Sequence, residues 1–358
     1  MLRFVLIFKP APPLAPGSVR RFRTENRRTT GQIPNKMLYP LKFKPILKEK
    51  IWGGRRLGEK LGKRLPAGRA VGESWELSGL DGNRSVVRNG PLKGNDLEEL
   101  IEVYMGELVG DRVYERFGLQ FPLLIKYLDV QQPLSVQVHP NDDLAAERHG
   151  SYGKTEMWYV VDCGPDAALR VGFDGPVTRE QYAEHVERGT LPELMAKARV
   201  HPGDTFFVPA GTVHTIEGSV LIAEIQQASD ITYRIYDWDR VGPDGRKREL
   251  QTDLAANAID FASGTSFDVT AAPERNRFVT LKKCPYFTTN LLLLDGRIER
   301  NHVGRDSFAV YMMLDGRMTL SWDKGTETVD RGETVLLPAC IEEIGLEGRG
   351  KLLEIYID

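Results

Sequence analysis

The sequence has no long apolar run, little cysteine and almost no net charge. A transmembrane helix needs about 18 consecutive apolar residues. No stretch of this sequence is that long, so we expect no membrane partner. The three cysteines, Cys163, Cys284 and Cys340, lie far apart and show no Cys-x-x-Cys spacing, which argues against a disulfide framework or a thiolate zinc site. A net charge of -2 gives no reason to expect nucleic acid. A reducing cytoplasm is the expected location, and the oligomeric state is left open.

The length and composition indicate a globular protein of more than one domain. A chain of 358 residues suits two or three domains, and contents of 41% hydrophobic and 27% charged residues are ordinary. Residues 1–36 differ from the rest because they are rich in proline and arginine. We expect them to be a disordered extension, or the result of a start codon placed too early, with Met37 as a natural beginning.

The secondary-structure pattern favours a mainly β fold. Many short apolar runs are separated by glycine and proline, which is typical of antiparallel strands. Helical spacing of apolar residues occurs at 95–118, 178–189 and 248–261. Helices and strands do not alternate regularly, so a doubly wound parallel sheet is not expected. The pattern predicts antiparallel barrels, or jelly rolls, with a few accessory helices.

An internal repeat predicts two such barrels. The pattern Gly-x5-Pro-Ala begins at Gly203 and again at Gly332, but Glu343 replaces His214 at the end of the second copy. No Gln-x-His or His-x-His pair precedes that second copy. We therefore expect a catalytic barrel over residues 37–260 and a second, metal-free barrel over residues 261–358, which packs against the first and shapes it.

Four residues of the first barrel form a candidate metal site. Alternate residues of a strand share one face, so Ser135, Gln137 and His139 should point the same way. By the same parity Lys154 and Glu156 lie together, and the turn at Pro209 brings His214 to a strand that faces inward. Nitrogen and oxygen ligands then converge from Gln137, His139, Glu156 and His214. The remaining histidines, His149, His185, His201 and His302, are expected at the surface.

These motifs resemble a known family. The spacing Gly203-x5-Pro209-x-Gly211-x2-His214 is similar to the second motif of cupin barrels. Together with the runs 135–142 and 153–158, and with 224–227 and 232–238, it is similar to the type I mannose-6-phosphate isomerases in their short bacterial form. The resemblance covers about residues 38 to 358. It departs from the general cupin motif at Gly218, where cupins have asparagine, but that position is not a ligand.

The resemblance implies roles for the residues that match. The four ligands would bind Zn²⁺, Arg234 would be the essential catalytic arginine, and Lys154 and Glu224 would be a basic and an acidic group in the pocket. We assign substrate contacts to Ser135, Lys154 and Arg234, and the expected partner is a small sugar phosphate. Isomerisation of an aldose to a ketose moves a proton between C1 and C2 through an enediol, for which a redox-silent Lewis acid is suitable.

Two alternatives remain open from the sequence. Fe(II) also binds histidine and carboxylate ligands, so a metal-dependent cupin oxygenase has a similar pattern. A sugar-phosphate-binding cupin without turnover is the other. The sequence also leaves open whether Lys154 or Glu224 takes the C2 proton.

Overall fold

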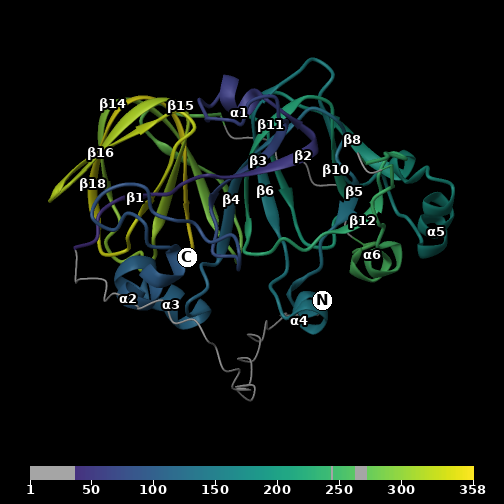
Figure 1. Ribbon diagram of the computed structural model, residues 1–358, viewed down its shortest axis with the longest axis horizontal. Helices are drawn as coiled ribbons and strands as arrows, with labels where there is room; N and C mark the ends of the chain where they lie inside the picture. The colour runs from purple at the N-terminus through teal and green to yellow at the C-terminus, as the bar shows by residue number, and fades with distance from the viewer. Residues whose placement is uncertain (1–36, 243–244, 263–271) are drawn as a thin grey trace, which may run out of the picture. The chain divides into compact units, whose positions relative to one another are not determined.

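A computed structural model describes residues 37–242, 245–262 and 272–358, so the extension predicted at 1–36 lies outside the described residues. The described chain is mainly β, which confirms the predicted fold class, and its strands form three antiparallel sheets (Figure 1). No helix in this part is long and apolar enough to cross a membrane.

Two of the sheets together form the first barrel. The six-stranded sheet has the order β2 (Ile46–Gly54), β3 (Val71–Leu77), β4 (Leu123–Val130), β11 (Val220–Gln227), β6 (Glu156–Cys163) and β9 (Thr205–Val208). The five-stranded sheet has the order β12 (Tyr233–Tyr236), β5 (Val136–Val138), β10 (His214–Glu217), β7 (Ala168–Phe173) and β8 (Met195–Arg199).

The interior of this barrel is apolar at one end and polar at the other. Side chains of one parity point inward, and on β4 they run from Lys126 through Leu128 to Val130. On β6 the inward series begins at Glu156 and continues with Trp158. Leu128, Trp158 and Val130 belong to one buried apolar cluster, whereas Lys126 and Glu156 precede it on their strands. The site therefore lies at the polar end of a packed barrel.

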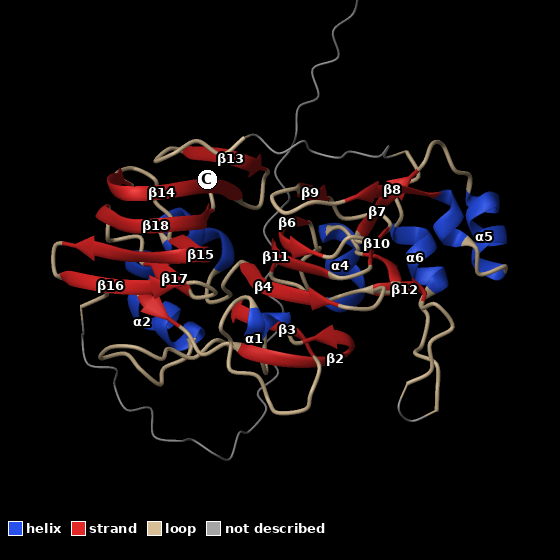
Figure 2. Cartoon of the chain, turned by 90° about the horizontal axis from the view of Figure 1, so that it is seen from above, coloured by secondary structure: helices blue, strands red, loops and turns tan. Residues whose placement is uncertain are grey.

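Short helices cover the outer face of the five-stranded sheet. They are α5 (Arg179–Glu187), the 3-10 turn η1 (Leu191–Leu194) and α6 (Thr252–Ala258), and Figure 2 shows α5 and α6 beside β8 and β12. A buried cluster joins Val136 and Val138 of β5 to Tyr182 of α5 and Ala255 of α6. Because Val136 and Val138 are held on this outer face, the residue between them, Gln137, points to the barrel interior.

The third sheet forms the second barrel. Its order is β1 (Leu41–Lys42), β17 (Thr334–Leu337), β15 (Ala309–Trp322), β18 (Glu343–Tyr356), β14 (Thr288–Asn301) and β13 (Phe278–Lys283), with β16 (Gly325–Asp330) paired to β15. The first strand of this sheet comes from the N-terminal part of the described chain, since Leu41 pairs with Leu336. The division into two barrels at residue 260 stays a prediction. The third sheet contains strands from both sides of residue 260, because β1 pairs with β17.

The remaining helices are α1 (Arg56–Glu59), α2 (Leu97–Val109), α3 (Asp111–Phe117) and α4 (Asp142–His149). The helical region expected over 95–118 is confirmed, but it consists of two helices, because Gly110 has positive φ and separates α2 from α3, and Met105, also with positive φ, kinks α2. Asp96 caps its start with a capping box, as the sequence allowed. The helix expected over 248–261 is also shorter, because the residues before Thr252 bind the edge of β12 instead.

Candidate functional site

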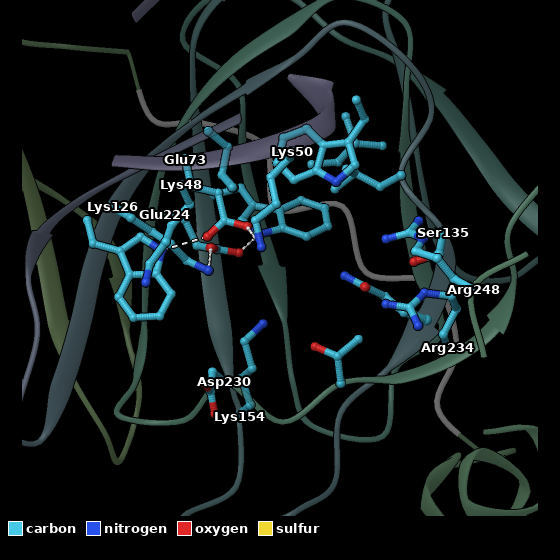
Figure 3. A pocket seen from close by; sticks show the side chains of 18 of the residues that line it. Lys48, Lys50, Glu73, Lys126, Ser135, Lys154, Glu224, Asp230, Arg234 and Arg248 are labelled. Carbon is cyan, nitrogen blue, oxygen red and sulfur yellow. Dashed lines mark hydrogen bonds and ion pairs between the residues drawn. The ribbon is translucent and has the colours of Figure 1, made fainter. Parts of the chain in front are cut away.

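A cavity of about 430 Å³ opens at the polar end of the first barrel. Its lining includes the predicted residues Ser135, Gln137, Lys154, Glu224 and Arg234. Figure 3 shows Ser135 and Arg234 at one end of the cavity and Glu224 at the other. The structure thus brings the sequence-predicted pocket residues into one site.

Three of the four predicted metal ligands lie within reach of one ion. The ligand atoms of His139, Glu156 and His214 all lie within 4.8 Å of one another, and all three residues are buried. Carboxylate oxygens of Glu156 lie 3.7 Å from His139 Nε2 and 3.5 Å from His214 Nε2. The amide nitrogen of Gln137 lies 3.1 Å from His214 Nε2, so the fourth predicted ligand adjoins the cluster.

Hydrogen bonds hold both imidazoles in the orientation that metal ligation requires. Nδ1 of His139 donates to the carbonyl of Ile231 over 2.9 Å, and Nδ1 of His214 donates to the carbonyl of Thr212 over 2.9 Å. A proton on Nδ1 leaves the lone pair on Nε2, which faces the cluster in each case. This pair of backbone contacts is the usual outer shell of a histidine metal site.

The electrostatics of the cluster also suit a cation. Burial holds the pKa of His139 well below its usual range and lowers the pKa of His214 to about 3, with Lys154 adding to both effects. Both rings are therefore neutral at pH 7, as ligands must be. Glu156 Oε1 is buried and has no hydrogen-bond partner among the described residues. A buried, unpaired carboxylate oxygen between two neutral imidazoles fits a divalent metal ion.

Lys154 places a positive charge at this cluster. Its Nζ lies 2.8 Å from His139 Nε2 and also donates a hydrogen bond to Glu156. The neighbouring Gly153 allows the approach, because a Cβ there would lie 2.6 Å from the backbone nitrogen of Asp142. The ligand atoms of His139 and Glu156 therefore attract a cation, here the ammonium group of Lys154. Lys154 is also close enough to act on a substrate bound beside a metal.

Glu224 is ionised by a lysine that the sequence reading did not single out. Lys126 Nζ lies 2.6 Å from a Glu224 oxygen, and Trp158 Nε1 donates to the other oxygen over 2.9 Å. Burial opposes ionisation of Glu224, but Lys126 and Lys154 outweigh it and lower its pKa to about 2. Lys126 lies opposite Glu224 in the register of β4 and β11, which cannot be read from either strand alone.

Arg234 lies beside the metal ligands on the neighbouring strand. It is opposite Gln137 in the register of β12 and β5 and lines the cavity with Thr232. Its Nε is buried without a partner among the described residues, and Nη1 donates to the carbonyl of Glu249 over 2.9 Å. Among the described residues Arg234 forms no ion pair with Asp230 or Asp237, and Asp237 pairs with Arg248 instead.

The alternation of side chains along the strands is interrupted at two places beside the site. Tyr236 packs against the outer cluster rather than sharing the face of Arg234, because a bulge in β12 adds one residue between them. Leu134 lines the cavity instead of facing outward with Val136, because β5 begins only at Val136 and the alternation does not extend before it.

The other wall of the cavity comes from β2 and β3. Lys50 pairs with Glu73 over 3.0 Å, and Glu73 accepts a hydrogen bond from Trp75 Nε1 over 2.6 Å. Lys48 lies 4.6 Å from the centre of the Trp75 ring. Trp52 and Trp75 also line the cavity. The lysines of this wall were missed, because no motif marks them.

The second barrel has different residues at the positions of the metal ligands. His214 faces Gln137 across β10 and β5, and Glu343 faces Asn301 across β18 and β14. Glu156 lies opposite Val208, and Val208 corresponds to Leu337 in the repeat. Leu337 lies opposite Ala309, so Ala309 takes the place of Glu156 in the second barrel. A methyl group at 309 cannot ligate a metal, and this explains in physical terms why we expect no ion there.

The acidic position of the pocket does recur in the second barrel. Glu224 lies between Lys126 and Trp158, and Glu354 lies in the same way between Asn290 and Tyr311. The guanidinium of Arg300 closes this second site by donating two hydrogen bonds to Glu354.

The surface position predicted for His302 is wrong, because its ring is buried. It accepts or shares hydrogen bonds with Tyr311 and Arg305 in the network around Glu354. Burial, with Arg305 adding to it, lowers the pKa of His302 to about 4.

Family models and known proteins match most of the chain. Residues 40–159 match the family model "Phosphomannose isomerase type I, catalytic domain", and residues 277–357 match "Mannose-6-phosphate isomerase, cupin domain". The chain is 38% identical to mannose-6-phosphate isomerase ManA of Bacillus subtilis, over 89% of this chain and 99% of that protein. A mannose-6-phosphate isomerase of Streptococcus mutans is 33% identical, over 87% and 96% of the two chains.

A solved structure shows the same fold. The crystal structure of the mannose 6-phosphate isomerase from Bacillus subtilis superimposes with a TM-score of 0.81 at 32% identity, and covers 89% of this chain and 99% of its own.

Proposed function

Since the chain belongs to the type I phosphomannose isomerase family, we propose that it interconverts mannose 6-phosphate and fructose 6-phosphate by proton transfer between C2 and C1. The observation that carries the proposal is the buried cluster of His139, Glu156 and His214, which contacts a cavity lined by Lys154, Glu224 and Arg234 through Lys154 and Gln137. The cytoplasmic location expected from cysteine usage stays a prediction.

The metal proposed for this site is Zn²⁺, held by Gln137, His139, Glu156 and His214. Two neutral imidazoles and an unpaired buried carboxylate support a borderline ion of this kind. When bound, zinc would supply Lewis-acid polarisation of the substrate carbonyl. The chain's own groups then need to bind the sugar phosphate, move one proton and stabilise the enediolate.

Two groups are placed to move the proton. Glu224 is kept ionised by Lys126, so it can accept a proton from a substrate carbon in the cavity. Lys154 lies between the metal ligands and the cavity and can hold a proton near the substrate oxygens. Arg234 faces the same space with an unpaired Nε, where its charge would stabilise the enediolate.

The test is turnover by purified protein together with metal analysis. We expect about one zinc per chain and conversion of mannose 6-phosphate to fructose 6-phosphate. His139→Ala should lose both metal and turnover, while His201→Ala, at an exposed histidine outside the cluster, should lose neither. Conversion without bound metal would refute the zinc assignment. Binding of mannose 6-phosphate without turnover by the zinc-loaded protein would refute the enzymatic proposal.

A further inference from the structure

The cavity continues past Arg234 to a second arginine that no motif indicated. Arg248 lies in the segment between β12 and α6 and lines the cavity. Figure 3 shows its side chain beside those of Ser135 and Arg234, at the opposite end from Lys126 and Glu224. This end of the cavity is therefore lined by two guanidinium groups and a hydroxyl.

A buried carboxylate fixes the guanidinium of Arg248. Nε donates to Asp237 over 2.7 Å, and Nη2 donates to the other oxygen of the same carboxylate. Asp237 is only 6% exposed, so the pair is shielded from water on the Asp237 side, whereas the side chain of Arg248 is 29% exposed. Asp237 thus accepts from Nε and Nη2 of Arg248. No described residue accepts a hydrogen bond from the third nitrogen of this guanidinium, Nη1.

The segment that carries Arg248 also holds Arg234. The backbone nitrogen of Arg234 donates to the side chain of Gln251, and the backbone nitrogen of Gln251 donates to the carbonyl of Arg234. With Nη1 of Arg234 on the carbonyl of Glu249, its buried Nε is left without a partner. Two arginine forks are therefore held by one segment, and each keeps a donor that no described residue accepts from.

The lysine end of the cavity offers a poorer anion site. Lys50 is paired with Glu73 and Lys126 with Glu224, so an anion there would compete with carboxylates at 3.0 Å and 2.6 Å. Planar guanidinium forks match phosphate oxygens in pairs, which an ammonium group cannot do. An unsatisfied, partly buried donor is also costly unless a ligand accepts from it.

We propose that Arg248, with Ser135 beside it, binds the phosphate group of the sugar-phosphate substrate and so sets the requirement for a phosphorylated sugar. This assignment rests on the proposed function for the identity of the sugar, but not for the binding of phosphate. Because Arg234 lies opposite Gln137, the arginine end of the cavity adjoins the proposed metal site.

The test compares Arg248→Met with Arg240→Met. Both variants remove a guanidinium that lies against Asp237, but Arg240 does not line the cavity. Titration calorimetry with inorganic phosphate and steady-state kinetics with mannose 6-phosphate are measured on metal-loaded protein. We expect Arg248→Met to weaken phosphate binding and raise KM by about 10- to 100-fold, with kcat changed by less than about threefold. Arg240→Met should change neither, and Arg248→Lys should recover only part of the loss.

Phosphate affinity and KM near wild type in folded Arg248→Met would overturn the assignment, and so would equal losses in Arg240→Met. If the wild-type protein binds phosphate through Arg248 but does not isomerise mannose 6-phosphate, the phosphate site stands and the proposed function fails.

Discussion

The hydroxyl of Tyr286, in the loop between β13 and β14, donates a 2.7 Å hydrogen bond to the carboxylate of Asp142 at the start of α4. The other oxygen of Asp142 accepts from the backbone nitrogen of Gly153 and from the side chain of Gln227. Gln227 in turn accepts from the backbone nitrogen of Thr155. A residue of the second barrel thereby supports the short segment that carries Lys154.

This contact predicts that Tyr286→Phe lowers kcat. Loss of one hydrogen bond to a charged group loosens the segment 153–155, so we expect kcat to fall by about 2- to 10-fold with metal content unchanged. The control is Tyr39→Phe, which removes a hydroxyl bonded to Asn89 and Leu92, residues outside the cavity lining. Equal kcat values in both variants would show that the second barrel does not act on Lys154 through Tyr286.

The closed site of the second barrel predicts a loss of stability without a loss of metal. Arg300→Met leaves the fully buried carboxylate of Glu354 without its two-pronged partner, which should cost about 3 kcal/mol of unfolding free energy. Chemical denaturation measures this change, and metal analysis of the folded variant should still give the wild-type value. A large drop in bound metal would mean that Arg300 acts on the first barrel.

The contact of β1 with the second barrel predicts sensitivity to acid. Burial disfavours ionisation of Glu333, but hydrogen bonds from Lys42 and Arg88 outweigh it and lower its pKa to about 2 from an ordinary value of 4.5. The stabilising contribution of a lowered carboxylate pKa is complete above about pH 4.5 and is lost as the pH falls toward 2. Wild-type protein should therefore exceed Glu333→Gln in stability by about 1–3 kcal/mol at pH 7, and by much less near pH 2.5.

Urea unfolding at several pH values measures this difference in stability. Metal-free protein is used, so that release of metal in acid does not contribute to the result. Glu347→Gln, at an exposed carboxylate, serves as the matched surface control. A gap between wild type and Glu333→Gln that is independent of pH would contradict the assignment of the ion pair.

Mutation of Arg234 distinguishes stabilisation of the enediolate from binding of the substrate phosphate. If its charge stabilises the enediolate, Arg234→Ala should keep its metal and lose about 10²- to 10³-fold in kcat. Arg234→Lys should not recover this fully, because an ammonium group lacks the planar fork. A rise in KM alone, with kcat near wild type, would show that Arg234 only binds phosphate.

Alternation within one strand and the spacing of the repeat were sufficient to predict that the four candidate metal ligands converge, whereas the roles of Arg234 and Glu224 came from the family resemblance. Gln137 and His139 follow from parity on β5, and His214 follows from the turn at Pro209, because these features depend on neighbours in sequence. Lys126 was not predictable, since its place beside Glu224 depends on the register between β4 and β11.

The same limit explains the other differences. Arg248 was expected in a helix, but its binding to Asp237 and the contacts of Gln251 with β12 hold that segment extended until Thr252. His302 was expected at the surface because no motif contains it, and it is buried by the network around Glu354, which joins strands distant in sequence.

The most direct test of the central claim is exchange of the C2 proton. Mannose 6-phosphate is incubated in D₂O with zinc-loaded protein, and NMR follows both deuterium at the substrate carbons and the appearance of fructose 6-phosphate. We predict exchange and conversion by the wild-type protein, and neither by His214→Ala, whose metal content should fall with them. Conversion at the wild-type rate by folded, metal-free His214→Ala would contradict an isomerase that works through the metal cluster of the first barrel.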